Sequence, residues 1–134
     1  MRLNHVTLSV SDVEESAAFY RRLGLEQIVA AYPGYARLHA PEGEATLSLH
    51  PADSEAGGET HDGCASIHFE VDDVDAAVAE LKARGFEFAV DPVDQPYLWR
   101  EAILLDPDGH RIFIFNAGDN RLDPPWRLPR PAGA

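Results

Sequence analysis

The sequence predicts an α+β fold made of two similar modules, each with the element order βαβββ. Three observations predict it: the chain repeats itself, its apolar stretches alternate with the period of a strand, and a capped amphipathic helix follows the first strand of each repeat. The repeat sets HVTLSVSDVEESAAFYRRLGLE (5–26) against SIHFEVDDVDAAVAELKARGFE (66–87), so that Val10 matches Val71. Two repeats are too few for a solenoid. We therefore expect a single domain over 1–134, with module one at 3–50, a linker at 51–63, module two at 64–116 and an extended tail at 117–134.

The first strand and the helix of each module have clear local signals. Apolar and polar residues alternate over 3–10 and 65–71, which is typical of strands with two different faces. Ser11 and Asp12 before the first helix, and Asp72 and Asp73 before the second, suit a helix N-cap. Each helix has an apolar stripe and ends before a glycine suited to a left-handed residue: Val13, Ala17, Tyr20 and Gly24 in module one, and Val74, Val78, Leu81 and Gly85 in module two.

Three further strands are expected after each helix. In module one they are 27–32, 35–39 and 45–50, separated by YPGY and APEGEA. In module two they are 86–90, 98–105 and 111–115, separated by DPVDQP and DPDG.

The composition narrows the range of functions. The chain has 134 residues, 45% of them hydrophobic, which suffices for one globular domain with its own core. A formal net charge of −12 repels phosphate backbones and anionic membranes, so we expect neither as a partner. MRLNHVTLSV has no apolar run of the signal-peptide type, so a cytoplasmic location is expected. The single cysteine, Cys64, can form no internal disulfide, and a structural role is favoured over a nucleophilic one.

Four strands have one apolar face and one face rich in polar or aromatic residues. Either this second face is the wet side of an antiparallel sheet, or the two sheets curl so that it lines a cavity for a small molecule. Its residues are His5, Thr7, Ser9, Thr46, Ser48, His50, Ser66, His68, Glu70, Arg111, Phe113 and Phe115.

Three stretches carry a resemblance to a known family. NHVTLSVSDVEESAAFYRRLGL, SIHFEVDDVDAAVAELKARGF and LLDPDGHRIFIF resemble the vicinal oxygen chelate superfamily, which includes glyoxalase I, extradiol dioxygenases, methylmalonyl-CoA epimerase and the fosfomycin- and bleomycin-resistance proteins. The resemblance covers roughly 3–116 and is specific for the fold, not for the reaction. It implies a glyoxalase-like fold, with paired βαβββ modules that form an incomplete barrel around a cavity, and a homodimer.

The resemblance also implies where a metal would bind. Metal-dependent members take ligands from four inward positions, which fall here on His5, Ser48, Ser66 and Phe113. Only His5 keeps a strong ligand, because a hydroxyl binds divalent ions weakly and a phenyl group does not bind them. A displaced site is the alternative, in which His5, His50 and His68, with or without Glu70, hold Zn, Ni, Mn or Fe. Otherwise these histidines bond to each other or to a ligand.

Two functions of different kinds follow. In the first, the protein binds a small organic ligand without the usual metal or another cofactor, as in the bleomycin-resistance branch. In the second, it is a divalent-metal-dependent lyase, isomerase or dioxygenase, with His68 or Glu70 moving the proton. Arg37 and Arg100 either hold an acid group of the ligand or form surface ion pairs. The aromatic side chains of the loops either line the cavity mouth or make ordinary core and dimer contacts; they are Tyr32, Tyr35, Tyr97, Trp99 and Trp126. Trp126 either docks on the body or covers a site. The expected ligand-binding residues are His5, Ser48, His50, Ser66, Trp99, Arg100, Phe113 and Phe115.

Overall fold

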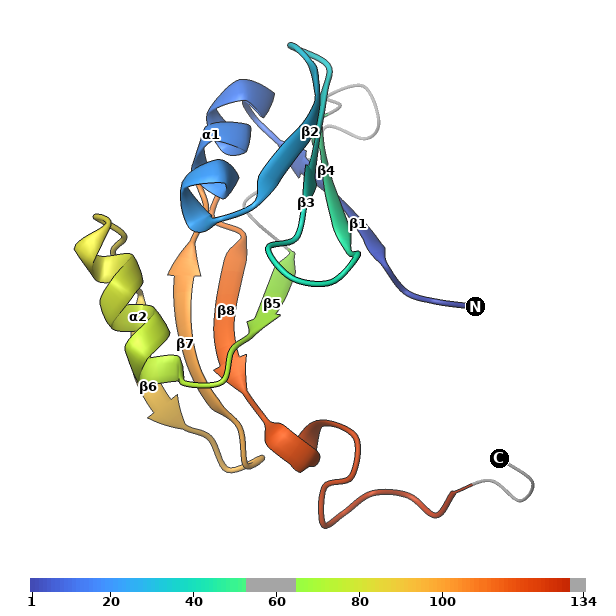
Figure 1. Cartoon of the computed structure of the whole chain (residues 1–134), viewed down its shortest axis with the longest axis vertical. Coiled ribbons are helices and arrows are strands. Elements are labelled where there is room, and N and C mark those ends of the chain that lie inside the picture. Colours follow the sequence, from blue (N-terminus) through green and yellow to red (C-terminus); the bar gives the residue numbers. More distant parts are fainter. Residues whose placement is uncertain (53–64, 131–134) are drawn as a thin grey trace. The chain divides into compact units, whose positions relative to one another are not determined.

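The computed structural model describes residues 1–52 and 65–130 (Figure 1). In these ranges the chain forms two four-stranded sheets, two α-helices and a short 3₁₀ helix, η1 (Gly118–Arg121). The residues divide into two compact units. The first comprises 1–52, 65–66 and 105–111, and the second comprises 67–104 and 112–130. The turn at 105–111 thus belongs to the first unit, although it joins two strands of the second sheet.

The first sheet has the strand order β1-β4-β3-β2. β1 (His5–Val10) runs parallel to β4 (Thr46–Pro51), whereas β3 (Tyr35–His39) runs antiparallel to both β4 and β2 (Glu26–Ala31). Helix α1 (Val13–Leu23) lies beside one face of this sheet (Figure 1). The side chains on that face and the apolar stripe of the helix are buried together, including Leu8, Val10, Val13, Ala17, Tyr20, Leu38 and Leu49.

The ends of α1 confirm the signals in the sequence. Asp12 is the N-cap in extended conformation, and its side chain accepts a hydrogen bond from the backbone N–H of Glu15 at 3.0 Å. The helix ends at Gly24, whose φ of 124° is a conformation that residues with a Cβ rarely adopt.

The second sheet has the order β5-β8-β7-β6 and a helix packed beside it. Its strands are β5 (Ser66–Glu70), β6 (Val90–Asp94), β7 (Arg100–Leu105) and β8 (Arg111–Asn116), and its helix is α2 (Val74–Ala83). The Asp73 side chain caps α2 by accepting from the N–H of Ala76, and Gly85 follows the helix with a φ of 95°. The expected stripe of α2, Val74, Val78 and Leu81, is buried.

The expected strand at 86–90 is wrong, because the strand β6 runs from Val90 to Asp94, through the DPVD stretch that was expected to break it. Two features of the sheet explain why Pro92 is tolerated there. β6 is an edge strand, and its pairing with β7 is irregular between Val90 and Val93. A residue without an N–H costs little where no neighbouring strand or no regular ladder needs that donor.

The chain has the α+β, glyoxalase-like fold that the sequence predicts, with a helix and a four-stranded sheet in each unit. Neither α-helix in the described ranges is long and apolar enough to cross a membrane. Most of the expected linker, and Cys64, lie outside the described residues.

Candidate functional site

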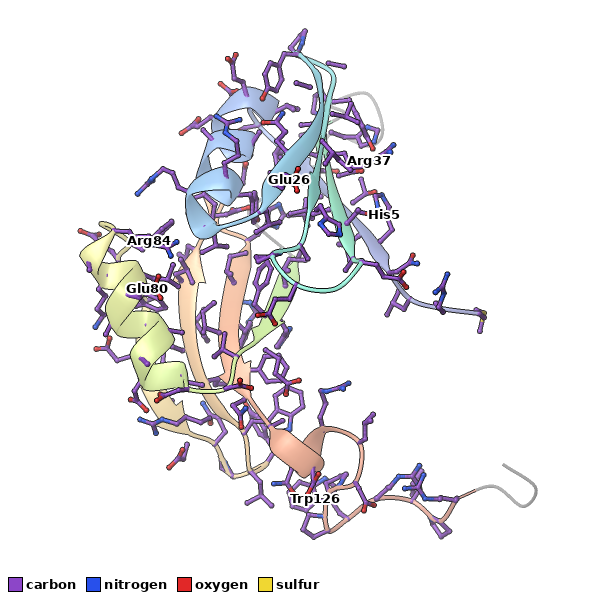
Figure 2. The ribbon with its side chains drawn as sticks, in the orientation of Figure 1. His5, Glu26, Arg37, Glu80, Arg84 and Trp126 are labelled. Carbon is purple, nitrogen blue, oxygen red and sulfur yellow. The ribbon has the colours of Figure 1, made fainter. Side chains whose placement is uncertain are left out.

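In the first unit, the sheet face turned away from α1 carries a row of polar side chains. The strand register places Ser48 of β4 between Thr7 of β1 and Arg37 of β3. His5 lies opposite Thr46 in the next row of the same face. Figure 2 shows His5 and Arg37 projecting from this side of the sheet. The alternation of the strands therefore gathers these side chains as the sequence predicts.

Four hydrogen bonds join five side chains of this face into a continuous chain, namely Arg37, Tyr35, Ser48, His5 and Thr46. Arg37 Nε donates to the Tyr35 hydroxyl at 2.8 Å, and that hydroxyl lies 2.5 Å from Ser48 Oγ. Ser48 Oγ lies 3.0 Å from Nε2 of His5, whose Nδ1 lies 2.6 Å from Thr46 Oγ1. Every bond is satisfied when Thr46 donates to Nδ1, Nε2 donates to Ser48, and Ser48 donates to the Tyr35 hydroxyl.

Ser48 and Tyr35 are the fixed centre of this chain. The Ser48 side chain is 1% exposed, so its hydroxyl is out of water and its partners are those two protein groups. Its bond with Tyr35, assisted by the hydrogen bond and the charge of Arg37, lowers the pKa of the Tyr35 phenol, while burial acts in the opposite direction. The ring of His50 meets that of Tyr35 edge-on at 5.2 Å.

In the second unit, the corresponding sheet face carries a cluster of aromatic rings, His68, Trp99, Phe113 and Phe115, which we call the aromatic cluster. His68 stacks on Phe113 with 4.2 Å between the ring centroids and 11° between the planes. Trp99 stacks on Phe115 at 4.8 Å and 21°. His68 meets both Trp99 and Phe115 edge-on, so the rings alternate stacked and perpendicular contacts. Phe115 is buried, whereas Phe113 and Trp99 are half-buried and His68 is exposed.

A buried acid lies next to the aromatic cluster. The Tyr97 hydroxyl donates to Oε1 of Glu101, whose side chain is 3% exposed, and the Tyr97 ring meets Trp99 edge-on at 5.8 Å. Burial, followed by the hydrogen bond to Glu101 and its charge, raises the pKa of Tyr97 to about 12. Sequence reasoning missed Glu101; the available signal was that it shares the parity of Trp99 two residues before it.

Other expected site residues lie in different surroundings. Glu70 is exposed, 3.8 Å from Arg121 and 3.5 Å from the backbone N–H of Ala117. Ser66 is exposed at the start of β5. Arg100 forms hydrogen bonds with two acids. Asp75 of α2 accepts from its Nε and Nη2, and Asp94 of β6 accepts from its Nη1. These carboxylates occupy the hydrogen-bond donors of the guanidinium. Arg100 therefore forms the surface ion pair that was one of its two predicted roles.

The DPDGH turn carries a second buried polar group that sequence reasoning missed. Asp106 accepts from the Tyr20 hydroxyl and from the backbone N–H groups of Asp108 and His110. His110 Nε2 lies 2.9 Å from the Ser9 carbonyl, and its Nδ1 accepts from the N–H of Ala65 at 3.2 Å. These bonds are all internal to the unit, so they stabilise its fold.

Comparisons with known proteins fix the family. The model of the Glyoxalase/Bleomycin resistance protein/Dioxygenase superfamily matches residues 2–114. The chain belongs to this superfamily. Among solved structures, a superfamily protein from Nocardioides is 26% identical and has a TM-score of 0.75, over 96% of this chain and 90% of that one. A lactoylglutathione lyase from Agrobacterium tumefaciens shares the fold at 22% identity, with a TM-score of 0.67 over 86% and 92% of the two chains.

Two curated relatives in the superfamily are enzymes by name. The human mitochondrial methylmalonyl-CoA epimerase is 35% identical over 79% of this chain, and the Schizosaccharomyces pombe lactoylglutathione lyase is 29% identical over 84% of it. The chain spans 66% of the length of the first and 44% of the second.

The four positions at which the family resemblance implies metal ligands do not offer a donor set that fits a divalent metal. At these positions the chain has one imidazole, two hydroxyls and one phenyl group, on His5, Ser48, Ser66 and Phe113. Both nitrogens of His5 have hydroxyl partners, and Phe113 is stacked on His68. Within 1–52 and 65–130, no group of three or more His, Cys, Asp or Glu residues is placed to hold an ion. The displaced set stays a prediction, because His5 and His50 belong to the first unit and His68 to the second.

Proposed function

We propose that the protein binds a small organic molecule with a flat ring, and that it does so without the metal of its metal-dependent relatives. The observation that carries the proposal is the stack of His68 on Phe113, at the position where those relatives are expected to supply an acid. A phenyl group there replaces ion chemistry with apolar contact area. Within the aromatic cluster, His68 is exposed and Phe113 and Trp99 are half-buried, so their rings are accessible to a ligand.

The aromatic cluster suits a planar ligand for physical reasons. Apolar surface removed from water contributes about 25 cal/mol per Å². Stacked or edge-on ring pairs add about 0.5–1.5 kcal/mol beyond that area. The rings of the cluster already hold one another in place, so binding costs less conformational entropy than ordering free side chains would.

The chain allows a clean fluorescence test, because it has two tryptophans and only Trp99 lies in the aromatic cluster. In a Trp126→Phe background, a panel of planar aromatic and α-keto compounds should contain ligands that change Trp99 emission and raise the melting temperature. Phe113→Ala should lower the affinity for these ligands. Phe88→Ala, which removes a half-buried phenyl outside the cluster, is the matched control and should not. Equal loss in both variants, or ligands that leave Trp99 emission unchanged, would contradict the proposal.

A metal-dependent lyase, isomerase or dioxygenase is the second candidate function. The similarity to proteins named lactoylglutathione lyase and methylmalonyl-CoA epimerase favours it. In that case we expect His68 or Glu70 to act as the base. The two functions differ in metal content, so elemental analysis of the purified chain separates them. One tightly bound divalent ion per chain that is lost in His68→Ala would establish the second.

We also propose a homodimer in the cytoplasm, as the family resemblance implies. The tail supports self-association, because Leu122, Trp126 and Leu128 are 67%, 58% and 81% exposed in the single chain. Several exposed apolar side chains within one short segment offer a surface that a second chain could cover. Light scattering should show a dimer for the wild type. For Trp126→Ala it should show a smaller fraction of dimer at the same concentration. A monomeric wild type at micromolar concentration would contradict the proposal.

A further inference from the structure

The two arginines that the sequence singles out have opposite surroundings. Arg100 is neutralised by Asp75 and Asp94. Arg37 has no carboxylate partner within 1–52 and 65–130, where its guanidinium makes a single hydrogen bond, from Nε to the Tyr35 hydroxyl. The contrast marks Arg37 as a cation kept for something other than the fold.

We propose that Arg37 binds the carboxylate group of a small organic molecule through its terminal nitrogens, Nη1 and Nη2. Tyr35 occupies Nε, which leaves the outer edge of the guanidinium with parallel N–H donors. That edge matches the two oxygens of a carboxylate in the bidentate geometry that gives the strongest hydrogen bonds of this kind.

The Arg37 fork is held in place before any ligand arrives. β3 lies inside the sheet between β2 and β4, where Arg37 is in register with Val29 on one side and Ser48 on the other. The guanidinium carbon lies 5.4 Å from the centroid of the Tyr35 ring, and the Tyr35 hydroxyl is tied to the buried Ser48. A side chain anchored in this way loses little rotamer freedom on binding.

A carboxylate fits this site better than a phosphate. The site offers one guanidinium, which balances one negative charge. A dianionic phosphate would leave an excess charge in the field of a chain with a formal net charge of −12.

This inference goes beyond the proposed function and stands on different residues. Arg37, Tyr35 and Ser48 all belong to the first unit, whereas the aromatic cluster belongs to the second. The variants that test each therefore differ, and the result for Arg37→Gln bears on this inference alone.

The experiment titrates the isotope-labelled full chain with benzoate, benzamide and inorganic phosphate. Benzoate and benzamide have the same ring and differ in charge. In the wild type, benzoate should shift the Arg37 Nε–H resonance, and dissociation constants are then taken from the backbone amides of β3. Arg37→Gln should weaken benzoate by roughly ten- to a hundredfold, the usual effect of losing a charged hydrogen-bond partner, and leave benzamide unchanged. Arg37→Lys keeps the charge but not the fork and should give an intermediate affinity.

Arg2→Gln is the matched control, because it removes the same charge from the exposed Arg2–Glu44 pair of the same unit. It should leave all three affinities unchanged. The inference is overturned if benzoate and benzamide bind equally, or if Arg37→Gln binds benzoate as the wild type does. Tighter binding of phosphate than of benzoate would overturn the carboxylate assignment.

Discussion

Tyr20 and Asp106 lie 86 positions apart in the chain and share a buried hydrogen bond of 2.7 Å. It joins helix α1 to the turn between β7 and β8, so the late DPDG turn helps to complete the first unit. Burial, followed by the charge of Asp106 and the hydrogen bond to it, strongly raises the pKa of the Tyr20 phenol. Tyr20 therefore stays a hydrogen-bond donor at pH values at which an ordinary phenol loses its proton.

Tyr20→Phe should lower the free energy of unfolding by roughly 1–3 kcal/mol, because it leaves a buried carboxylate oxygen without its donor. Urea unfolding followed by circular dichroism measures the change. Tyr32→Phe makes the same chemical change at an exposed ring and should have a small effect. Equal effects of the two variants would contradict a special role for the Tyr20–Asp106 bond.

His110→Phe should destabilise the chain by about 2–4 kcal/mol, because it removes the partners of the Ser9 carbonyl and the Ala65 N–H together. The aromatic ring is kept, so loss of packing is not the main cause. Thermal and urea unfolding check the value. His39→Phe, at a half-buried position on β3, is the control. If the free energy of unfolding of His110→Phe equals that of the wild type, solvent replaces these bonds and the prediction is contradicted.

The Tyr97–Glu101 pair should make stability depend on pH in the alkaline range. The pKa of Tyr97 is raised from its usual 10.0 to about 12 in the folded chain. The phenol donates to Glu101 only while protonated, so the bond contributes fully below pH 10.0 and its contribution is lost as the pH rises through about 12. Ultraviolet difference spectroscopy should show a tyrosine ionisation near pH 12 that is absent in Tyr97→Phe, whereas Tyr20, whose pKa is raised further, ionises only above it. A late ionisation that persists in that variant would assign it elsewhere.

Metal content should be substoichiometric in the purified protein, because three of the four superfamily ligand positions carry Ser48, Ser66 and Phe113. Phe113→Glu should raise the affinity for divalent ions, since it places a carboxylate at a position expected to ligate in the metal-dependent relatives. Elemental analysis and a metal titration measure both. One tightly held ion per wild-type chain would contradict the first expectation, and no gain in the variant would contradict the assignment of Phe113 to that position.

The fold class, both helices with their caps and most of the strands could be predicted from the residues alone. Those signals are local: a period of two or of 3.6, an Asp before a helix and a Gly after it. The same parity placed His5, Ser48 and Phe113 on the faces that carry the hydrogen-bond chain and the aromatic cluster. Position within a sheet is not local, which is why Pro92 was expected to break a strand that tolerates it at the sheet edge.

The pairing of polar groups, in contrast, could be read only from the folded chain. Arg37 and Arg100 are alike in the sequence, yet one is bound by two acids and the other by a phenol, because strand pairing and the position of α2 set their neighbours. Asp106 reaches Tyr20, and His110 reaches Ser9, only once a turn from the second sheet is part of the first unit. Hydrogen bonds act over about 3 Å, so partners far apart in the chain become identifiable only when the fold brings them to that distance.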